Sequence, residues 1–242
     1  MKILAKVEYL GTNYHGWQKQ IDASSVQEEI EKVLSQIFNK EINIYGSGRT
    51  DAGVHAKGQT FHFEVDKDVD LGRLKYSTNM LLPNDIHIIS FERVSDDFHA
   101  RFSAQGKHYQ YRINTADKNP FNFNTTYHYP YPLNIALLKV ALEGFKGKHN
   151  FQDFTSKEED EDGFVREISD VLLTQNGKEL IIDFFGSGFM RYMIRYIVGT
   201  ALAIASGKED IKYIKDHLDS STREITSYKA GSEGLFLIDV IY

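Results

Sequence analysis

Hydrophobic and polar residues alternate in several short stretches of the chain, and this alternation predicts strands with one buried face. Residues 3–10 and 59–65 show it most clearly, with apolar positions two residues apart. Further strands are expected at residues 41–45, 85–94, 107–114, 165–174, 178–186 and 234–242. One pair of these strands is joined around Asn176-Gly177, a dipeptide typical of a tight β-hairpin turn.

A second pattern, with apolar residues three and four positions apart, predicts helices between the strands. The clearest helix covers residues 26–38, where Ser25 and Glu28 fit a capping box. Further helices are expected at residues 71–82, 134–147, 189–206 and 209–218. Gly147 is expected to end one of them in the left-handed conformation.

Residues 115–133 hold three of the four prolines and show no clear period, which indicates a connection between two halves. Each half reads as a βαββαβ-like set, so the fold class is expected to be α+β. The prediction is two ferredoxin-like or RRM-like halves, each an antiparallel sheet flanked by helices, with a catalytic cleft between them. The N-terminal half is expected at 1–116 and the C-terminal half, which completes the cleft, at 117–242.

The composition excludes several kinds of catalytic and metal site. The chain has 242 residues, a net charge of −6 and no cysteine, which removes disulfides, thiolate nucleophiles and cysteine zinc sites. The chain has no run of about 18 apolar residues, which a membrane-spanning helix would need, and its first residues do not resemble a signal peptide. The cytoplasm is therefore the expected location. Residues 99–112 contain three cations and no acid, which allows a local basic and aromatic surface on an acidic protein.

One carboxylate stands out. Asp51 lies among Gly46, Gly48 and Gly53, in a turn that leads into the strand at 59–65. An aspartate in such a turn commonly bonds its own backbone amides. Two features favour a second role, because Arg49 would keep the carboxylate ionised and the flanking strands would hold the turn rigid.

Other chemical sites around Asp51 fit less well. A metal site of Asp51, His55 and His62 matches no zinc spacing, although a metal-dependent hydrolase on these residues stays an alternative. Paired-carboxylate hydrolysis lacks a marked second acid, and no Gly-Lys-Ser/Thr follows the glycines as a P-loop requires. A lone ionised carboxylate remains, acting as nucleophile or electrostatic stabiliser without a cofactor or metal.

The motifs carry a resemblance. GTNYHGWQ, GRTDAGVHA, ARFSA with KHYQYRI, GKHNFQDFTS, FMRYMIRYIVG and EGLFLIDV occur in this order and resemble the TruA family of tRNA pseudouridine synthases. The resemblance implies a cofactor-free isomerase that converts uridine to pseudouridine in the tRNA anticodon stem-loop, at positions 38–40. It also implies a homodimer that binds tRNA. A catalytically silent RNA-binding module of the same fold is the alternative.

The resemblance also implies site residues. The family's catalytic aspartate falls on Asp51, its active-site tyrosine on Tyr109, and the arginine that pairs with the carboxylate on Arg195. From the residues alone, Tyr109 is better explained by packing beside Tyr111, and Arg195 is equally well explained by a surface position on an amphipathic helix. Leu235 is expected to line the base pocket, although a strand leucine is ordinarily core.

Several further residues are candidates for RNA contact. Arg49 is expected to touch RNA or reinforce Asp51. The remaining basic candidates are Arg101, Lys107, Arg112, Arg166 and Arg191. An aromatic loop, with Tyr14, His15, Trp17 and Gln18 following Gly11, is expected either to contact tRNA or to pack against the sheet. The acidic run 158–162 would repel phosphate beside RNA, unless it is simply a solvated loop.

Overall fold

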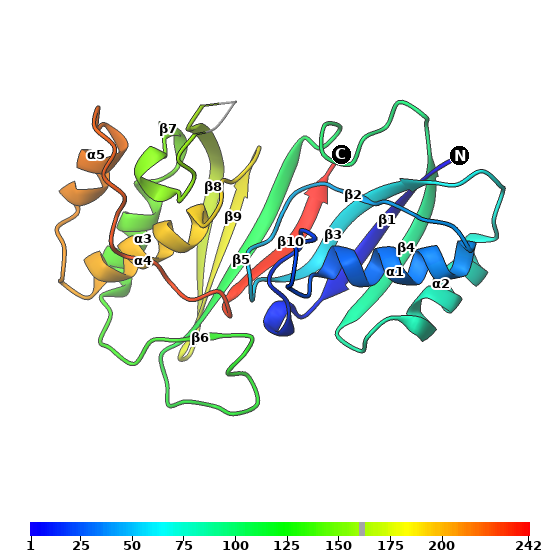
Figure 1. Cartoon of the computed structure of the whole chain (residues 1–242). Helices are drawn as coiled ribbons and strands as arrows, with labels where there is room; N and C mark the ends of the chain where they lie inside the picture. The colour runs from blue at the N-terminus through cyan, green and yellow to red at the C-terminus, as the bar shows by residue number, and fades with distance from the viewer. Residues whose placement is uncertain (160–162) are drawn as a thin grey trace. The chain divides into compact units, whose positions relative to one another are not determined.

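The computed structural model of the chain describes residues 1–159 and 163–242, which form two compact units (Figure 1). Unit 1 comprises Met1–Lys107 together with Phe236–Tyr242, and unit 2 comprises His108–Leu235. The predicted boundary at 116/117 therefore falls inside unit 2. The closing strand β10 (Leu235–Ile241) pairs in parallel with β3 (His55–Glu64), and this pairing places the end of the chain in unit 1.

Unit 1 contains a complete βαββαβ set. Its strands are β1 (Lys2–Tyr9), β2 (Tyr45–Gly46), β3 and β4 (Ile86–Val94), and its helices are α1 (Val26–Phe38) and α2 (Leu71–Leu81), with a short 3₁₀ helix η1 (Gly11–Asn13). The sheet runs β4-β1-β3-β10, and β2 also pairs with β3. The pairs β1–β3, β1–β4 and β2–β3 are antiparallel. This arrangement is ferredoxin-like, as expected for the first half.

Hydrophobic alternation places the core of unit 1 between sheet and helices. Ile3, Ala5 and Val7 of β1 are fully buried, as are Phe61 and Phe63 of β3. The ring of Phe38 on α1 lies 6.3 Å from that of Phe63. The predicted N-cap is confirmed, because the Ser25 side chain accepts a hydrogen bond from the Glu28 amide.

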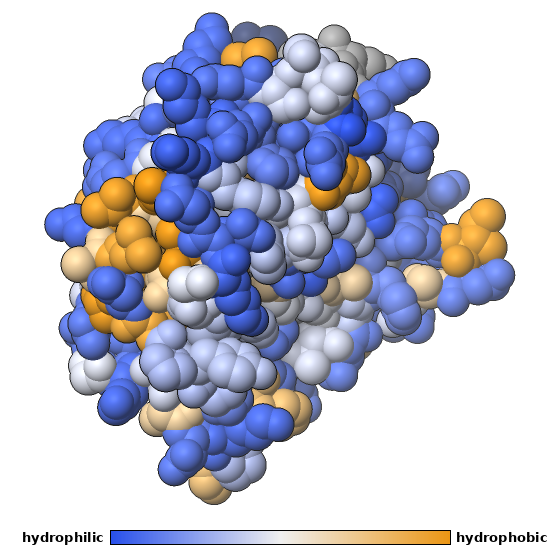
Figure 2. All heavy atoms as spheres, turned by 90° about the vertical axis from the view of Figure 1, so that its left-hand side faces the viewer, coloured by the Kyte–Doolittle hydropathy of each residue, from blue (hydrophilic) through white to orange (hydrophobic). Residues whose placement is uncertain are grey.

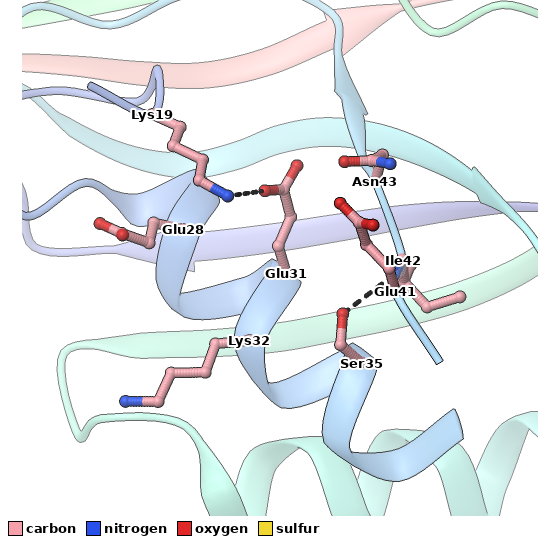
Figure 3. Close-up of a pocket in the computed structure, with 8 residues that line it drawn as sticks. All are labelled: Lys19, Glu28, Glu31, Lys32, Ser35, Glu41, Ile42 and Asn43. Carbon is pink, nitrogen blue, oxygen red and sulfur yellow. Dashed lines mark hydrogen bonds and ion pairs between the residues drawn. The ribbon is translucent and has the colours of Figure 1, made fainter. Parts of the chain in front are cut away.

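The predicted strand at 41–45 is largely wrong, since only Tyr45 and Gly46 join the ladder. Side chains of α1 take the place of a neighbouring strand. Ser35 Oγ accepts from the Ile42 amide at 2.9 Å (Figure 3). Glu31 Oε1 accepts from the Ile44 amide at 3.1 Å. These hydrogen bonds satisfy the extended backbone without a sheet.

Unit 2 is also α+β. Its strands are β5 (Gly106–Asn114), β6 (Tyr127–His128), β7 (Gly147–Asn150), β8 (Val165–Asn176) and β9 (Glu179–Gly186), in the order β5-β9-β8-β7 with β6 on β5. Its helices are α3 (Ile135–Glu143), α4 (Met193–Ala205) and α5 (Lys212–Leu218), with the 3₁₀ helix η2 (Gln152–Phe154). The predicted hairpin is confirmed: Asn176 pairs with Glu179, and Gly177 has φ +61°.

Three predictions for unit 2 need correction. The helix predicted at 134–147 ends at Glu143, and Gly147 opens β7 with φ +109° instead of capping the helix. The helix predicted at 189–206 begins at Met193, because Tyr192 takes φ +62° and interrupts it. The segment 115–133 is part of unit 2 and includes β6, which pairs in parallel with β5.

The face seen from the α5 side of unit 2 is mostly hydrophilic, with the largest group of hydrophobic residues at the left of the view and smaller ones elsewhere (Figure 2). Across residues 1–159 and 163–242, every helix is too short or too polar to cross a bilayer.

Candidate functional site: the Asp51 turn and its partners

Asp51 lies in the loop between β2 and β3. The aromatic loop at 11–18 holds this turn in place through backbone hydrogen bonds. The Gly53 amide donates to Tyr14 O at 3.3 Å, and the Trp17 amide donates to Thr50 O at 3.1 Å. Gly16 has φ +101°, and a Cβ placed on it would lie 2.6 Å from Thr50 O. The two loops therefore interlock through their backbones, which leaves no space for a side chain at Gly16.

Trp17 serves this packing. Its side chain is buried, and its ring centroid lies 6.0 Å from those of Tyr9 and Phe61. A Cβ on Gly46 would lie 2.6 Å from Trp17 Nε1, so a glycine is needed where β2 crosses the indole. The structure thus favours packing against the sheet over an exposed stacking role for the tryptophan.

Side chains of the sheet also hold the turn in place through hydrogen bonds. Gln59 is fully buried, accepts from Ser47 Oγ at 2.7 Å and donates to Gly48 O at 2.9 Å. The Tyr9 hydroxyl is 2.8 Å from Thr50 Oγ1. Burial raises the pKa of Tyr9, so its hydroxyl stays neutral. With its neighbours on both sides held, the half-buried Asp51 carboxylate sits on a rigid backbone.

The three basic candidates of unit 1 differ in what they contact. Lys107 is partly buried and donates to Ser47 O at 3.0 Å, and burial lowers its pKa to about 8, with Arg101 contributing. Arg49 is exposed, and its Nε donates to Gln18 at 3.0 Å. Arg101 is exposed, with its guanidinium 5.5 Å from the ring centroid of Phe102. Lys107 thus supports the turn, while Arg49 and Arg101 face outward.

The three residues expected to contact the base or the carboxylate, Tyr109, Arg195 and Leu235, belong to unit 2. Tyr109 is buried and meets the ring of Phe189 edge-on, with centroids 5.3 Å apart and planes at 77°. Tyr111 is fully buried, and its hydroxyl donates to Gly231 O at 2.7 Å. Leu235 is 4% exposed, as an ordinary core residue would be.

Arg195 is held in place rather than free at the surface. Its Nε donates to Ala230 O at 2.9 Å, and its own carbonyl accepts from the Ala230 amide at 2.9 Å. The guanidinium lies 5.1 Å from the ring centroid of Tyr192, the residue that interrupts the predicted helix. Backbone and ring together orient this cation, which argues against the freely solvated alternative.

The two histidines near Asp51 in sequence have separate environments. His55 accepts from the Gly11 amide through Nδ1 at 3.0 Å, and its ring lies 4.6 Å from that of Phe236. His62 accepts from the Ala100 amide through Nδ1 at 3.1 Å. Within the part of the chain that the structure describes, no three histidine, cysteine or acidic residues are grouped so as to hold a metal ion.

The other basic candidates lie in unit 2 and have local partners. Arg112 donates to Gln110 at 2.9 Å, Arg166 to Gly163 O at 2.9 Å, and Arg191 to Tyr192 Oη at 3.0 Å. In the acidic run, Glu158 and Glu159 are exposed, whereas 160–162 lie outside the described residues.

Sequence reasoning missed Gln59 and Thr50 as supports of the turn. For Gln59 a signal existed, because it shares the apolar face of β3 with Phe61 and Phe63. A polar residue on a buried face needs hydrogen-bond partners, and here they are the turn's own groups. Thr50 gave no such signal.

Comparison with known proteins identifies the family. The profile of a family described as tRNA pseudouridine synthase matches residues 5–103 and 141–242. A Streptococcus uberis protein named tRNA pseudouridine synthase A is 38% identical, over 98% of this chain and 97% of that protein. One of the same name from Streptococcus equi subsp. equi is 39% identical with the same coverage. A solved Cbf5–Nop10–Gar1 complex aligns with a TM-score of 0.36 and 11% identity, over 83% of this chain and 54% of that chain, too low to carry an argument.

Both matched ranges carry part of the candidate site: the first contains the interlocked turn with Asp51, and the second contains Arg195 and Leu235. The full-length relatives align with nearly the whole chain. This chain belongs to the tRNA pseudouridine synthase family.

Proposed function

We propose that this protein isomerises uridine to pseudouridine in the anticodon stem-loop of tRNA, at positions 38–40, with Asp51 as the catalytic carboxylate. The observation that carries the proposal is family membership over nearly the whole chain. The geometry of the turn supports it, because Asp51 sits on a backbone held by Gly16, Gln59 and Lys107. A rigidly held charge is what stabilisation of a reacting centre requires.

The reaction balances within the substrate. The bond from uracil N1 to the ribose C1′ breaks, the base turns, and a bond forms from C5 to C1′, while the proton on C5 is finally transferred to N1. A carboxylate has an ordinary pKa of about 3.9 and is charged at neutral pH. Asp51 either attacks C1′ or accepts a sugar proton as uracil leaves, and both routes need no cofactor.

The base must leave the stack before any of these atoms can be reached. We assign Tyr109 to hold the uracil and to assist loss of the C5 proton. Its edge-on contact with Phe189 gives the ring a defined orientation. Arg195 is assigned to orient the Asp51 carboxylate, and Leu235 to line the base pocket. The hydrogen bond from Arg195 to Ala230 O supports an oriented guanidinium.

The same proposal includes RNA contacts and assembly. Arg49 and Arg101 are exposed cations suited to phosphate, whereas Lys107 positions the turn. A net charge of −6 leaves limited basic surface on one chain, which favours a homodimer that shares one tRNA. A cytoplasmic location completes the proposal. Light scattering of the purified protein, with and without tRNA, tests the dimer.

The decisive experiment maps pseudouridine in tRNA transcripts incubated with purified protein. Wild-type protein is expected to modify positions 38–40. Asp51→Asn keeps the side-chain size but removes the charge, so turnover should fall by at least about 10³-fold. Asp22→Asn is the matched control: Asp22 is exposed in unit 1 with φ +61°, a conformation that asparagine also accepts.

The outcomes separate the alternatives. Undiminished conversion by Asp51→Asn would contradict the assignment of Asp51. Tight tRNA binding by wild-type protein without any pseudouridine would instead support a silent RNA-binding module.

A further inference from the structure

Unit 1 contains a hollow that the proposed reaction does not use. It has a volume of about 390 Å³, within the range of small-molecule sites. It is lined by segment 41–43 and by Lys2, Lys40, Tyr45, His62, Glu64 and His99. His62 is seven residues along β3 from His55, which follows the Asp51 turn. At about 3.3 Å per residue, this separates His62 from the Asp51 end of the turn by roughly 20 Å, although Tyr45 on the hollow adjoins the start of the turn at Gly46. A nucleotide bound here is therefore not the one that reacts at Asp51.

Aromatic rings form a continuous series beside this hollow. Tyr45 stacks on His62 with centroids 5.1 Å apart, His62 lies 4.6 Å from His99, and His99 lies 4.4 Å from Phe102. Tyr45 is 53% exposed and Phe102 is 76% exposed. The guanidinium of Arg101 lies 5.5 Å from the Phe102 ring centroid. We refer to Tyr45, His99 and Phe102 as the aromatic platform.

The platform is held firmly although its rings are open to solvent. The Ala100 amide donates to His62, and the Ala100 carbonyl accepts from the Tyr242 hydroxyl at 2.9 Å. Lys2 Nζ donates to Phe98 O at 2.9 Å. The backbone on both sides of His99 is thus fixed. Exposed apolar rings on a fixed backbone are preorganised for a ligand with flat faces.

The charges around the hollow suit a nucleotide better than a simple anion. Burial lowers the pKa of His62 to about 4, with His99 and Lys2 contributing, so its ring is neutral at physiological pH. Its Nδ1 accepts from Ala100, which places the remaining ring proton on Nε2 as a donor. Lys40 is paired with Asp66, Lys2 lies 3.7 Å from Glu64, and Glu41 adds a further acceptor, so the lining offers both signs of charge. Base edges offer both donors and acceptors.

A neighbouring hollow is less suited to bind a nucleotide. It has about 240 Å³ and lies against the same segment, Glu41, Ile42 and Asn43, but no aromatic ring lines it (Figure 3). Its charges are engaged internally: Glu31 accepts from Gln27, from the Ile44 amide and from Lys19. These contacts hold the segment to α1, and the aromatic rings of the larger hollow are what distinguish it as the candidate site.

We infer that the aromatic platform and its hollow bind an unpaired nucleotide of the RNA substrate, remote from the uridine that reacts. Every base has a face that stacks on an aromatic ring, and an arginine beside the ring can reach the adjoining phosphate. The inference rests on the proposed function in that the RNA is taken to be the substrate tRNA.

The test replaces the outer ring. Phe102→Leu keeps an apolar side chain but removes the aromatic face, and the tRNA dissociation constant is measured by filter binding at fixed salt. We expect roughly a tenfold rise in the dissociation constant, a further rise in the double variant with Tyr45→Leu, and less than about a twofold change in kcat at saturating tRNA. Phe102→Trp should retain wild-type affinity. Tyr76→Leu is the matched control, because Tyr76 is a 70% exposed ring on α2.

The source of the nucleotide is tested with two probes. A labelled hexauridylate RNA should lose affinity in Phe102→Leu, while uridine monophosphate should bind the wild-type protein more weakly than the hexamer does. Tighter binding of the monophosphate would assign the hollow to a free nucleotide and overturn the inference.

Other results would overturn it as well. Unchanged tRNA and hexamer affinity in the double variant would exclude stacking. A change in self-association by light scattering with unchanged RNA affinity would make the platform a protein contact. Loss of kcat without loss of affinity would assign it to the reaction. Failure of the proposed function is recognised separately, since wild-type protein would then form no pseudouridine even if Phe102→Leu still weakened RNA binding.

Discussion

The Asp51 turn and the aromatic platform belong to the same unit but are built in opposite ways. Around Asp51 the supporting side chains are buried, with Trp17 2% exposed and Gln59 fully buried. At the platform the backbone is fixed, but the rings of Tyr45 and Phe102 face solvent. Chemistry at one carbon requires a charge whose position does not vary, whereas stacking requires accessible area. The difference predicts that substitutions at the turn damage stability and turnover together, and that those at the platform affect affinity.

The largest expected effect lies in the interlocked loops. Gly16→Ala forces an L side chain into φ +101° and against Thr50 O, so the free energy of unfolding should fall by about 3 kcal/mol or more. Urea unfolding measures it. Gly72→Ala in α2 is the control: its Cβ would meet only the Asp70 carboxylate at 3.3 Å, and an alanine in a helix should be neutral or stabilising. Equal stability of the two variants would contradict the interlock.

A smaller effect is expected at Gln59. Gln59→Leu leaves Ser47 Oγ and Gly48 O without their described partner, which should cost about 2 to 3 kcal/mol of stability. Because both groups belong to the turn, kcat should fall while the tRNA dissociation constant changes little. Thermal unfolding and single-turnover kinetics measure the two effects. A variant that loses stability but keeps wild-type kcat would show that the turn does not need this support.

The stability of the protein should depend on pH through His62, whose ring lies between those of Tyr45 and His99. Its pKa is about 4 in the fold and about 6.5 in the unfolded chain, so above pH 6.5 both states are neutral. As the pH falls from 6.5 towards 4, the unfolded chain binds a proton that the folded chain rejects, and stability falls by about 2 kcal/mol. His62→Asn removes the titrating group. The difference in unfolding free energy between pH 7 and pH 4.5 should therefore shrink by about this amount; an unchanged difference would refute the shift.

The smallest effect is expected at Arg101. Arg101→Gln removes an exposed cation beside Phe102, so tRNA affinity should fall a few-fold and the slope of log affinity against log salt should decrease by about one. Phe102→Leu should leave that slope unchanged because stacking releases no counterion. Filter binding over a range of salt concentrations distinguishes the two. Identical slopes in both variants would place Arg101 away from phosphate.

The sequence was informative where local pattern and local structure coincide. Alternation located β1 and β3, Ser25 located the start of α1, and Asn176-Gly177 located the hairpin. These features depend on residues close in sequence. The α+β class followed from them, and so did the ferredoxin-like order of unit 1.

The errors arose where distant groups decide the structure. Segment 41–44 has a strand pattern, but Glu31 and Ser35 of α1 take its backbone hydrogen bonds. The pattern of β10 showed a strand but not that it pairs with β3. In the candidate site, the glycines correctly predicted a constrained turn. The sequence did not show that Lys107 points towards this turn, because that direction depends on its hydrogen bond to Ser47 O, 60 residues away in the chain.

The pairing of β10 with β3 has a consequence for biosynthesis. The first unit to emerge from the ribosome cannot finish its sheet until residues 236–242 arrive, so the start of β3 lacks its neighbouring strand on one side while all of unit 2 is translated. An open strand edge invites pairing with other chains. The Tyr242 hydroxyl also donates to Ala100 O beside the aromatic platform, so a chain without residues 236–242 would lack both a strand of this sheet and a hydrogen bond that fixes the loop of His99 and Phe102.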